Sequence, residues 1–390
     1  MTSLSEANTR FAYDLFQQLR KSEKKNIFYS PLSVSAAIAM TYLGAQGTTA
    51  SEIQKALHFN EVTEKTKGGA TTVPVKKLGN VHQQFQKLLT ELNKPTNAYE
   101  LHLANRLFAE KKFSFLQEYM DNVNTFYLAG METVDFVNAA DESRKKINSW
   151  VESQTKEKIK NLCPKDSINS ATVLALVNAI YFKGQWSEKF NPELTEQGEF
   201  WLNKDTSKPV QMMKKKGLFN FSKLEGMAAK ILEIPYKDND LSMVLLLPNE
   251  IDGLQQLEEK LTAEKLTEWT SSQNKSRTTV ALRLPRFKVE ESYNLQEVMS
   301  ALGMVAAFSP RDADFSGMTG SQELVVSKIQ HKSFVEVTEE GTEAAAASAI
   351  IMCKSALLFV ETFHCDHPFL FFIKHNTTNS ILFFGRVASP

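Results

Sequence analysis

Two apolar segments close to the C-terminus restrict the fold of this chain most strongly. Residues 368–375 read PFLFFIKH and residues 380–388 read SILFFGRVA. Both are short and rich in aromatic and aliphatic side chains, which predicts β-strands. Because side chains alternate between the two faces of a strand, a uniformly apolar strand needs cover on both faces. The chain must therefore fold with these strands between other layers.

Strand patterns recur through the second half of the chain, whereas the first half is mostly helical by pattern. Further strands are expected at 230–236, 241–248, 278–290 and 332–340, with two short helices within 248–269. Helices are expected at 30–46, 47–58 and 142–162, and another near the N-terminus after a capping box at Ser3 and Glu6. Helices first and strands later indicate the α+β class. Without an internal repeat or a clean linker, residues 1–390 are expected to form a single domain.

Composition argues against nucleic acid and membrane as partners. The chain has 45 Lys+Arg and 45 Asp+Glu, so its formal net charge is zero and it lacks the basic excess of a nucleic-acid binder. Its longest apolar runs are too short to span a bilayer. Glu6, Arg10 and Asp14 leave no uncharged stretch for a signal-peptide core, so we expect a cytoplasmic protein. Release from cells by a non-classical route stays open.

The reactive side chains do not form a recognisable catalytic or metal site. Cys163, Cys353 and Cys365 are an odd, sparse set that fits a reducing compartment without disulfides. His364-Cys365-Asp366-His367 contains nucleophile and ligand types, but four consecutive residues cannot all converge on one point. The cluster also precedes a predicted strand, where a turn is expected. We therefore expect no catalytic residue, no metal and no cofactor.

One polar segment stands apart from the helices around it. Residues 62–80 are rich in Gly, Thr and Lys and have no periodicity. This composition predicts a mobile surface loop inserted between two helices. A plain solvated loop is favoured over a partner-binding role.

The segment 339–360, EEGTEAAAASAIIMCKSALLFV, places small residues before large apolar ones. By helix propensity alone its alanines would form a helix. In an extended strand, side-chain alternation would instead place Thr342, Ala344 and Ala346 on one face, followed by Ser348, Ile350 and Met352. Glu343 would then fall on the opposite face.

Several motifs together strongly resemble the serpin family and, within it, the intracellular ovalbumin-like clade that includes the squamous cell carcinoma antigens. They extend from end to end of the chain: NIFYSPLSVSAAIAM (26–40), LVNAIYFKGQW (176–186), LPRFKVEESYNL (284–295), FVEVTEEGTEAAAA (334–347) and ILFFGRVASP (381–390). The resemblance implies a serpin fold of about nine helices around three β-sheets, with an exposed reactive loop near the C-terminus.

The resemblance also implies a mechanism and a partner. A serine or papain-like cysteine protease would cleave the reactive loop, which would insert into the central sheet as a new strand and carry the acyl-linked protease with it. The chain would thus be a monomeric, single-use inhibitor that ends in a covalent complex with its target. The alternative is a non-inhibitory serpin that acts as a binding or storage protein.

Site residues follow from matching the family's motifs to positions of this sequence. The hinge and reactive loop are expected within 339–362. The hinge is Glu339, Glu340, Gly341, Thr342, Glu343, Ala344, Ala345, Ala346, Ala347 and Ser348. Counting seventeen residues from Glu339 places the reactive bond at Ser355–Ala356, with Lys354–Ser355 as the second choice. The shutter beneath the central sheet is expected to comprise Ser30, Ser33, Asn178 and His331, and the breach at its top Trp186, Arg286 and Glu339.

Overall fold

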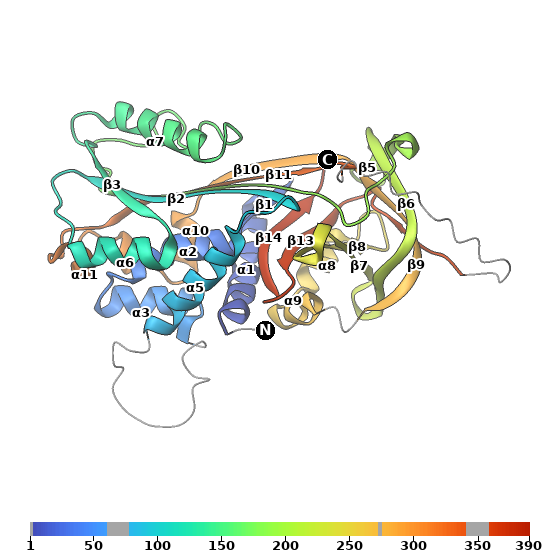
Figure 1. Cartoon of the computed structure of the whole chain (residues 1–390), viewed down its shortest axis with the longest axis horizontal. Helices are drawn as coiled ribbons and strands as arrows, with labels where there is room; N and C mark the ends of the chain where they lie inside the picture. The colour runs from blue at the N-terminus through green and yellow to red at the C-terminus, as the bar shows by residue number, and fades with distance from the viewer. Residues whose placement is uncertain (1–2, 61–77, 272–274, 341–358) are drawn as a thin grey trace, which may run out of the picture.

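The structure, a computed structural model, describes residues 3–60, 78–271, 275–340 and 359–390 (Figure 1). Both candidate reactive bonds, the hinge residues from 341 to 348, Cys353 and residues 62–77 of the predicted polar loop lie outside the described residues.

A five-stranded sheet forms the centre of the molecule. Its spatial order is β10 (Phe287–Asn294), β11 (Val326–Val337), β4 (Leu174–Gly184), β2 (Tyr99–Glu110) and β3 (Gly130–Val134). The pairs β10–β11 and β2–β4 are antiparallel, whereas β11–β4 and β2–β3 are parallel. Two strands far apart in the chain, β4 and β11, are thus direct neighbours in the middle of the sheet.

Helices cover both faces of this sheet, as its apolar composition requires. The first nine residues of β4 are all buried. Val177 and Ala179 pack in a cluster with Ile147 and Val151 of α7 (Ala140–Gln154), while Leu176 and Ile180 point into the main core. Figure 1 shows α7 above the sheet and the other helices of the first half below it. The alternating side chains of β4 therefore serve two separate cores.

The second sheet contains the two apolar C-terminal strands predicted at 368–375 and 380–388. It has nine strands in the order β1-β14-β13-β8-β7-β6-β9-β12, and β5 pairs with β6. Their bounds are β1 (Ile27–Tyr29), β5 (Glu196–Trp201), β6 (Ser207–Leu224), β7 (Ala229–Pro235), β8 (Leu241–Pro248), β9 (Ser276–Pro285), β12 (Glu361–His364), β13 (Phe369–His375) and β14 (Ser380–Val387). Every residue of β13 and β14 is buried. The prediction that these strands are covered on both faces is confirmed.

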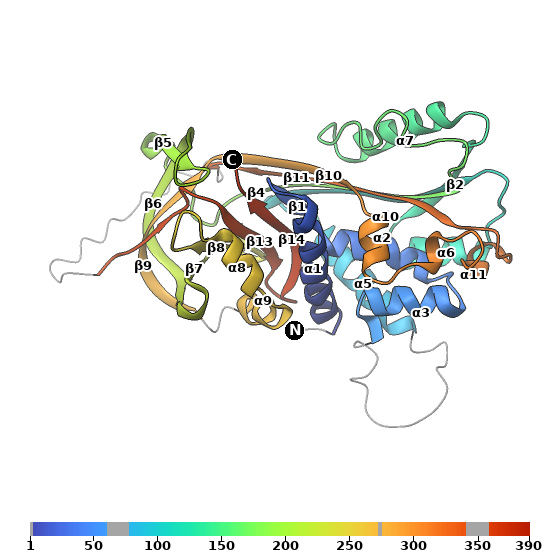
Figure 2. The same cartoon turned by 180° about the vertical axis from the view of Figure 1, so that it is seen from behind.

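Most of the remaining helices lie on the side of the five-stranded sheet opposite α7, and α8 (Leu254–Lys260) and α9 (Ala263–Thr270) lie near β8 and β13 (Figure 2). The others are α1 (Ser3–Ser22), α2 (Pro31–Tyr42), α3 (Gly47–Ala56), α5 (Leu78–Leu92), α6 (Gln117–Tyr127), α10 (Gln296–Ala301) and α11 (Ser316–Thr319). With α7, the described residues contain ten α-helices, close to the nine expected.

The structure differs from the sequence-based expectations in several places. Strands of the described residues join into two sheets rather than three, because the long β6 pairs with β9 along most of its length and with β7 at its end. The first half is less helical than predicted, since β2 and β4 lie there. Helix α7 ends at Gln154 rather than at 162, just before Lys156 and Glu157 adopt positive φ. Helix α5 begins at Leu78, inside the segment predicted to be loop.

Candidate functional site

The parallel pair β4–β11, called the seam below, is the feature of the central sheet that most concerns function. Residues 326–335 of β11 pair with residues 174–182 of β4, and His331 lies opposite Asn178. Beyond β11 the chain continues into Glu339 and Glu340, the first two residues of the predicted hinge, and it returns to the described residues at 359, before β12. The predicted hinge therefore begins directly at one end of the seam.

The four predicted shutter residues converge beneath the middle of the seam. Ser30 is the N-cap of α2, where its hydroxyl accepts a hydrogen bond from the Ser33 backbone N–H at 3.2 Å, and Pro31 begins the helix. Asn178 donates from its amide nitrogen to the Ser33 hydroxyl at 2.5 Å. All four side chains are buried. Helix α2 is thus connected through side chains to β4.

His331 connects the same group to β11. The Ser30 backbone N–H donates to His331 Nε2 at 3.0 Å, and His331 Nδ1 lies 2.5 Å from the Asn178 side-chain oxygen. Since Nε2 accepts a hydrogen bond, the neutral ring carries its proton on Nδ1 and donates it to Asn178. Burial lowers the pKa of His331 to about 3, which favours this neutral form. The two seam strands are therefore bonded to each other and to α2 through one imidazole.

The predicted breach residue Trp186 makes two hydrogen bonds to the chain just beyond β11. Its indole Nε1 donates to the Thr338 carbonyl at 2.8 Å, and its backbone N–H donates to the Glu340 carbonyl at 3.3 Å. The indole stacks on Tyr236 with ring centroids 4.5 Å apart. Thr338 and Glu340, at the start of the predicted hinge, are thus held by a stacked aromatic pair.

Glu339 and Arg286 meet as an ion pair beside this aromatic pair. Arg286 donates to both carboxylate oxygens of Glu339, at 3.1 Å from Nε and 2.5 Å from Nη2, and the Thr195 hydroxyl donates to the same carboxylate at 2.7 Å. Burial opposes the charged form, but the hydrogen bonds from Arg286 and Thr195 hold the pKa of Glu339 below its usual value. Glu339 is buried while the Arg286 side chain is about half exposed.

The sequence pattern missed three residues that complete this end of the seam. Thr195 lies in the turn after a short 3-10 helix, Tyr236 follows β7, and Lys183 forms an ion pair with Glu340 at 3.0 Å. No local pattern marks any of them, since each acts through a partner more than 40 residues away in the chain.

We expect Glu339→Ala to weaken the attachment of the hinge. The change removes three hydrogen bonds to a buried carboxylate but leaves Arg286 able to reach water, so the unfolding free energy should fall by about 1–2 kcal/mol. Glu340→Ala is the matched control, because the Glu340 side chain is exposed and its ion pair with Lys183 should contribute at most about 0.5 kcal/mol. Urea denaturation of both variants measures the difference, and equal losses would exclude a specific role for Glu339.

The His364–His367 cluster has structural contacts in place of a catalytic arrangement. Cys365 is fully buried, and burial raises the pKa of its thiol well above the usual value. His367 bonds the Pro248 carbonyl through Nε2 at 2.7 Å and lies 2.8 Å from Asp366 through Nδ1. A buried, protonated thiol is a poor nucleophile. Within the described residues, no group of three or more His, Cys, Asp and Glu side chains is arranged to hold a metal ion.

No helix in the part of the chain that the structure describes is both long enough and apolar enough to cross a membrane.

Comparisons with known proteins agree with the fold and with the sequence motifs. A sequence model described as "Serpin (serine protease inhibitor)" matches residues 6–390. Serpin B3 and Serpin B4 of Homo sapiens are 62% and 61% identical to this chain, with 100% of both chains covered in each case. Both belong to the squamous cell carcinoma antigens. The resemblance stated from the sequence is thereby confirmed.

Comparison with solved structures also indicates a serpin. The crystal structure of uncleaved ovalbumin superposes with a TM-score of 0.89 at 39% identity, covering 100% of both chains. A crystal structure of maspin superposes with a TM-score of 0.89 at 33% identity, covering 100% of this chain and 99% of maspin. Because the family match spans nearly the whole sequence and the fold agrees throughout, the chain belongs to the serpin family of protease inhibitors.

Proposed function

We propose that this serpin is a single-use inhibitor that traps a serine or papain-like cysteine protease by inserting its cleaved loop into the seam. The observation that carries the proposal is the placement of the seam next to a hinge of small residues. The chain leaves the C-terminal end of β11 and enters the sequence GTEAAAAS at residue 341. After cleavage, this segment would be free to fold back between β11 and β4.

The chain direction makes such an insertion favourable. A segment that leaves the end of β11 and turns back beside it runs antiparallel to β11, and also to β4, because those two strands are parallel. Insertion exchanges one parallel ladder for two antiparallel ladders, which are slightly more stable per residue. Each backbone hydrogen bond gained contributes about 1 kcal/mol net, so a strand of about twelve residues gains on the order of 10 kcal/mol.

The hinge composition suits passage between two strands. Small side chains at 341–348 need the strands to separate less than large ones would. In the inserted strand, alternation would direct Thr342, Ala344 and Ala346 into the core and Glu343 outward. The larger Ile350 and Met352 would enter last and add about 1.5–3 kcal/mol each through burial.

A non-inhibitory serpin is the second candidate, since ovalbumin and maspin have the same fold. What favours an inhibitor is the absence of charged or bulky side chains at the core-facing hinge positions Thr342, Ala344 and Ala346. Such residues would have to be buried during insertion, at a large free-energy cost.

Complex formation tests the proposal directly. The protein would be incubated with trypsin-, chymotrypsin-, elastase- and papain-like proteases and examined by denaturing gel electrophoresis. We expect at least one protease to form a covalent complex that survives the detergent. If every protease that cleaves the chain between residues 341 and 360 leaves only clipped product, the inhibitor proposal is wrong and the binding or storage alternative stands.

The reactive bond is proposed at Ser355–Ala356, with Lys354–Ser355 as the second choice. Mass spectrometry of the C-terminal peptide released from a trapped complex identifies the bond. A new N-terminus at Ala356 supports the first choice, and one at Ser355 supports the second and points to a trypsin-like target. Any other N-terminus from a trapped protease contradicts both.

We further propose that the protein acts inside the cell as a monomer. Its similarity to the ovalbumin-like clade and the burial of two free cysteines, Cys163 and Cys365, support this location. Size-exclusion chromatography with light scattering should give one species near 44.0 kDa. A stable dimer would contradict the monomer assignment.

A further inference from the structure

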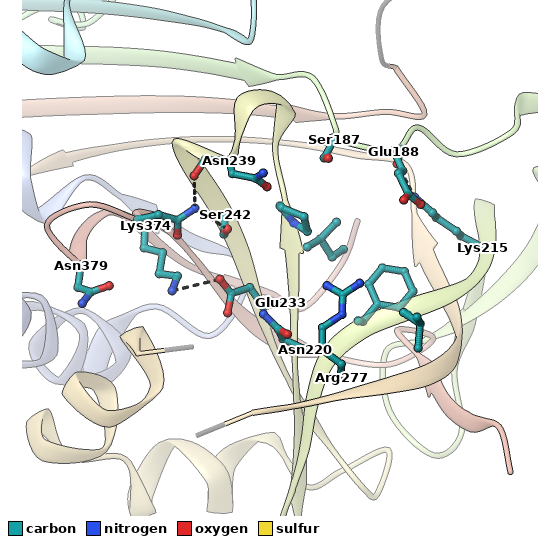
Figure 3. A pocket seen from close by; sticks show the side chains of 15 residues that line it. Ser187, Glu188, Lys215, Asn220, Glu233, Asn239, Ser242, Arg277, Lys374 and Asn379 are labelled. Atoms are coloured by element: carbon teal, nitrogen blue, oxygen red, sulfur yellow. Dashed lines mark hydrogen bonds and ion pairs between the residues drawn. The ribbon is translucent and has the colours of Figure 1, made fainter. Parts of the chain in front are cut away.

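A polar cavity of about 490 Å³ lies between the strands of the nine-stranded sheet and the segment after Trp186 (Figure 3). Its size is within the range of pockets that hold small organic molecules. Figure 3 shows side chains from three strands directed at the same space: Glu233 from β7, Lys374 from β13 and Arg277 from β9. The opposite wall comes from Ser187 and Glu188. The cavity is separate from the seam and from the predicted hinge.

Positive charge exceeds negative charge around this cavity. Lys374 lies 3.1 Å from one carboxylate oxygen of Glu233, and Lys275, behind the wall, lies 3.4 Å from the other. All three of these residues are buried. Two buried ammonium groups thus share a single carboxylate. Both ammonium groups also donate to carbonyls at the C-terminal end of α9, Lys374 to Thr270 at 2.6 Å and Lys275 to Trp269 at 2.7 Å. These contacts compensate the two ammonium groups within the protein itself.

Two further cationic side chains, Lys215 and Arg277, line the cavity, and they differ in whether an acidic residue is paired with them. Lys215 lies 3.4 Å from the carboxylate of Glu188, so these two charges offset each other. The guanidinium of Arg277 makes no ion pair or hydrogen bond within the described part of the chain, and it points into the cavity (Figure 3). Arginine presents a planar set of donors that fits an oxyanion in a bidentate manner. Arg277 is therefore the group with free capacity to bind an anion.

Uncharged polar groups complete the lining. The hydroxyl of Ser187 and the amide side chains of Asn220 and Asn379 face the cavity without a hydrogen bond to other described residues. Hydroxyls and amides both donate and accept, as the hydroxyl groups of a sugar do. The cavity thus combines a free anion-binding group with several groups suited to a polyhydroxylated body.

We propose that this cavity binds a small sugar that carries a phosphate or a sulfate group, with the oxyanion on Arg277 and the hydroxyls on Ser187 and the asparagine amides. Phosphate and sulfate are both tetrahedral oxyanions, and the site contains nothing that distinguishes one from the other. The proposal is independent of protease inhibition, because none of these residues belongs to the seam, the hinge or the reactive bond.

Isothermal titration calorimetry of the full chain with glucose 6-phosphate, glucose 6-sulfate and glucose, each at constant ionic strength, tests the site. We expect saturable binding of one or both anionic sugars with one site per chain, and much weaker binding of glucose. The relative affinities of the phosphate and the sulfate identify the preferred oxyanion. Absence of saturable binding by either anionic sugar up to about 10 mM would overturn the proposal and leave the cavity as a water-filled space.

Two arginine variants on the same strand make the test specific to the cavity. Arg277→Gln should weaken binding about tenfold or more, because it removes a charge-assisted bidentate contact. Arg283→Gln is the matched control, since Arg283 is also an exposed arginine of β9 but does not line the cavity. Unchanged affinity in Arg283→Gln supports the site. Equal weakening in both variants, or none in Arg277→Gln, would show binding elsewhere and contradict the proposal.

Discussion

Thr342→Arg is expected to abolish covalent complex formation while leaving cleavage of the reactive loop intact. In the proposed inserted strand, position 342 faces the core between β4 and β11, where residues such as Leu176 and Ile180 are buried. A guanidinium there would lose its hydration without gaining a partner, at a cost of several kcal/mol. Insertion would stall at its first residues. The acyl bond to the protease would then have time to hydrolyse, and the active protease would dissociate.

Glu343→Arg provides the matched control for this variant. It introduces the same side chain one residue later, where alternation directs it toward solvent. The ratio of covalent complex to clipped product is measured on denaturing gels. We expect Glu343→Arg to give a ratio close to that of the wild type, and Thr342→Arg to give clipped product only. Complex formation by Thr342→Arg at the wild-type level would refute insertion in this register.

His331→Ala should lower stability more than any change at the breach. The substitution leaves the Ser30 backbone N–H and the Asn178 side-chain oxygen without their partner, both in a buried environment. Unsatisfied buried groups cost about 1–3 kcal/mol each, so we expect a loss of about 3–5 kcal/mol. The midpoint of the first urea-unfolding transition at pH 7 measures it. A loss below about 1 kcal/mol would contradict the network described above.

The same residue predicts an acid dependence of stability. Burial lowers the pKa of His331 to about 3, from an ordinary value of 6.5. Between these pH values the unfolded chain binds a proton that the folded chain does not, so the stabilisation is complete above pH 6.5 and declines as the pH falls. Its slope is about 1.4 kcal/mol per pH unit.

A comparison of variants isolates this contribution from that of other histidines, such as His82, whose pKa burial lowers to about 4. Between pH 7 and pH 5, His331→Ala should lose about 2 kcal/mol less than the wild type. Ser33→Ala is the control, because it removes a bond of the same network but keeps the imidazole. It should retain the wild-type pH dependence, and a reduced dependence in Ser33→Ala would assign the effect to the network as a whole.

Sequence patterns predicted the parts of the fold that local chemistry determines. The C-terminal strands follow from their uniformly apolar composition, and α2 follows from the Ala-rich, nearly all-apolar run within 30–46. The strand β4 was harder, because LALVNAIYF is continuous apolar sequence that a buried helix could also have. Its identity depends on pairing with β2 and β11, which are far away in the chain.

In the candidate site too, some features were expected from the sequence and others depend on tertiary packing. The proximity of Ser30, Asn178 and His331 was expected from the family resemblance, and nothing in the local sequence of any one residue indicates it. The geometry adds the proton position on His331 and the contact of Thr195 with Glu339, both of which depend on tertiary packing. The cavity beside Arg277 could not be predicted at all, since its walls come from segments between residues 187 and 379 that share no motif.

Thermal unfolding of intact and loop-cleaved protein tests the central claim most directly, because it reports insertion without needing the natural target. The protein would be nicked by a protease that cleaves between residues 349 and 358, and the two chain fragments kept together. If the cleaved loop inserts into the seam, the gain of on the order of 10 kcal/mol should raise the unfolding temperature by at least about 10 °C. Cleaved Thr342→Arg should show no such rise. An unfolding temperature of the cleaved wild type within a few degrees of the intact protein would contradict the account.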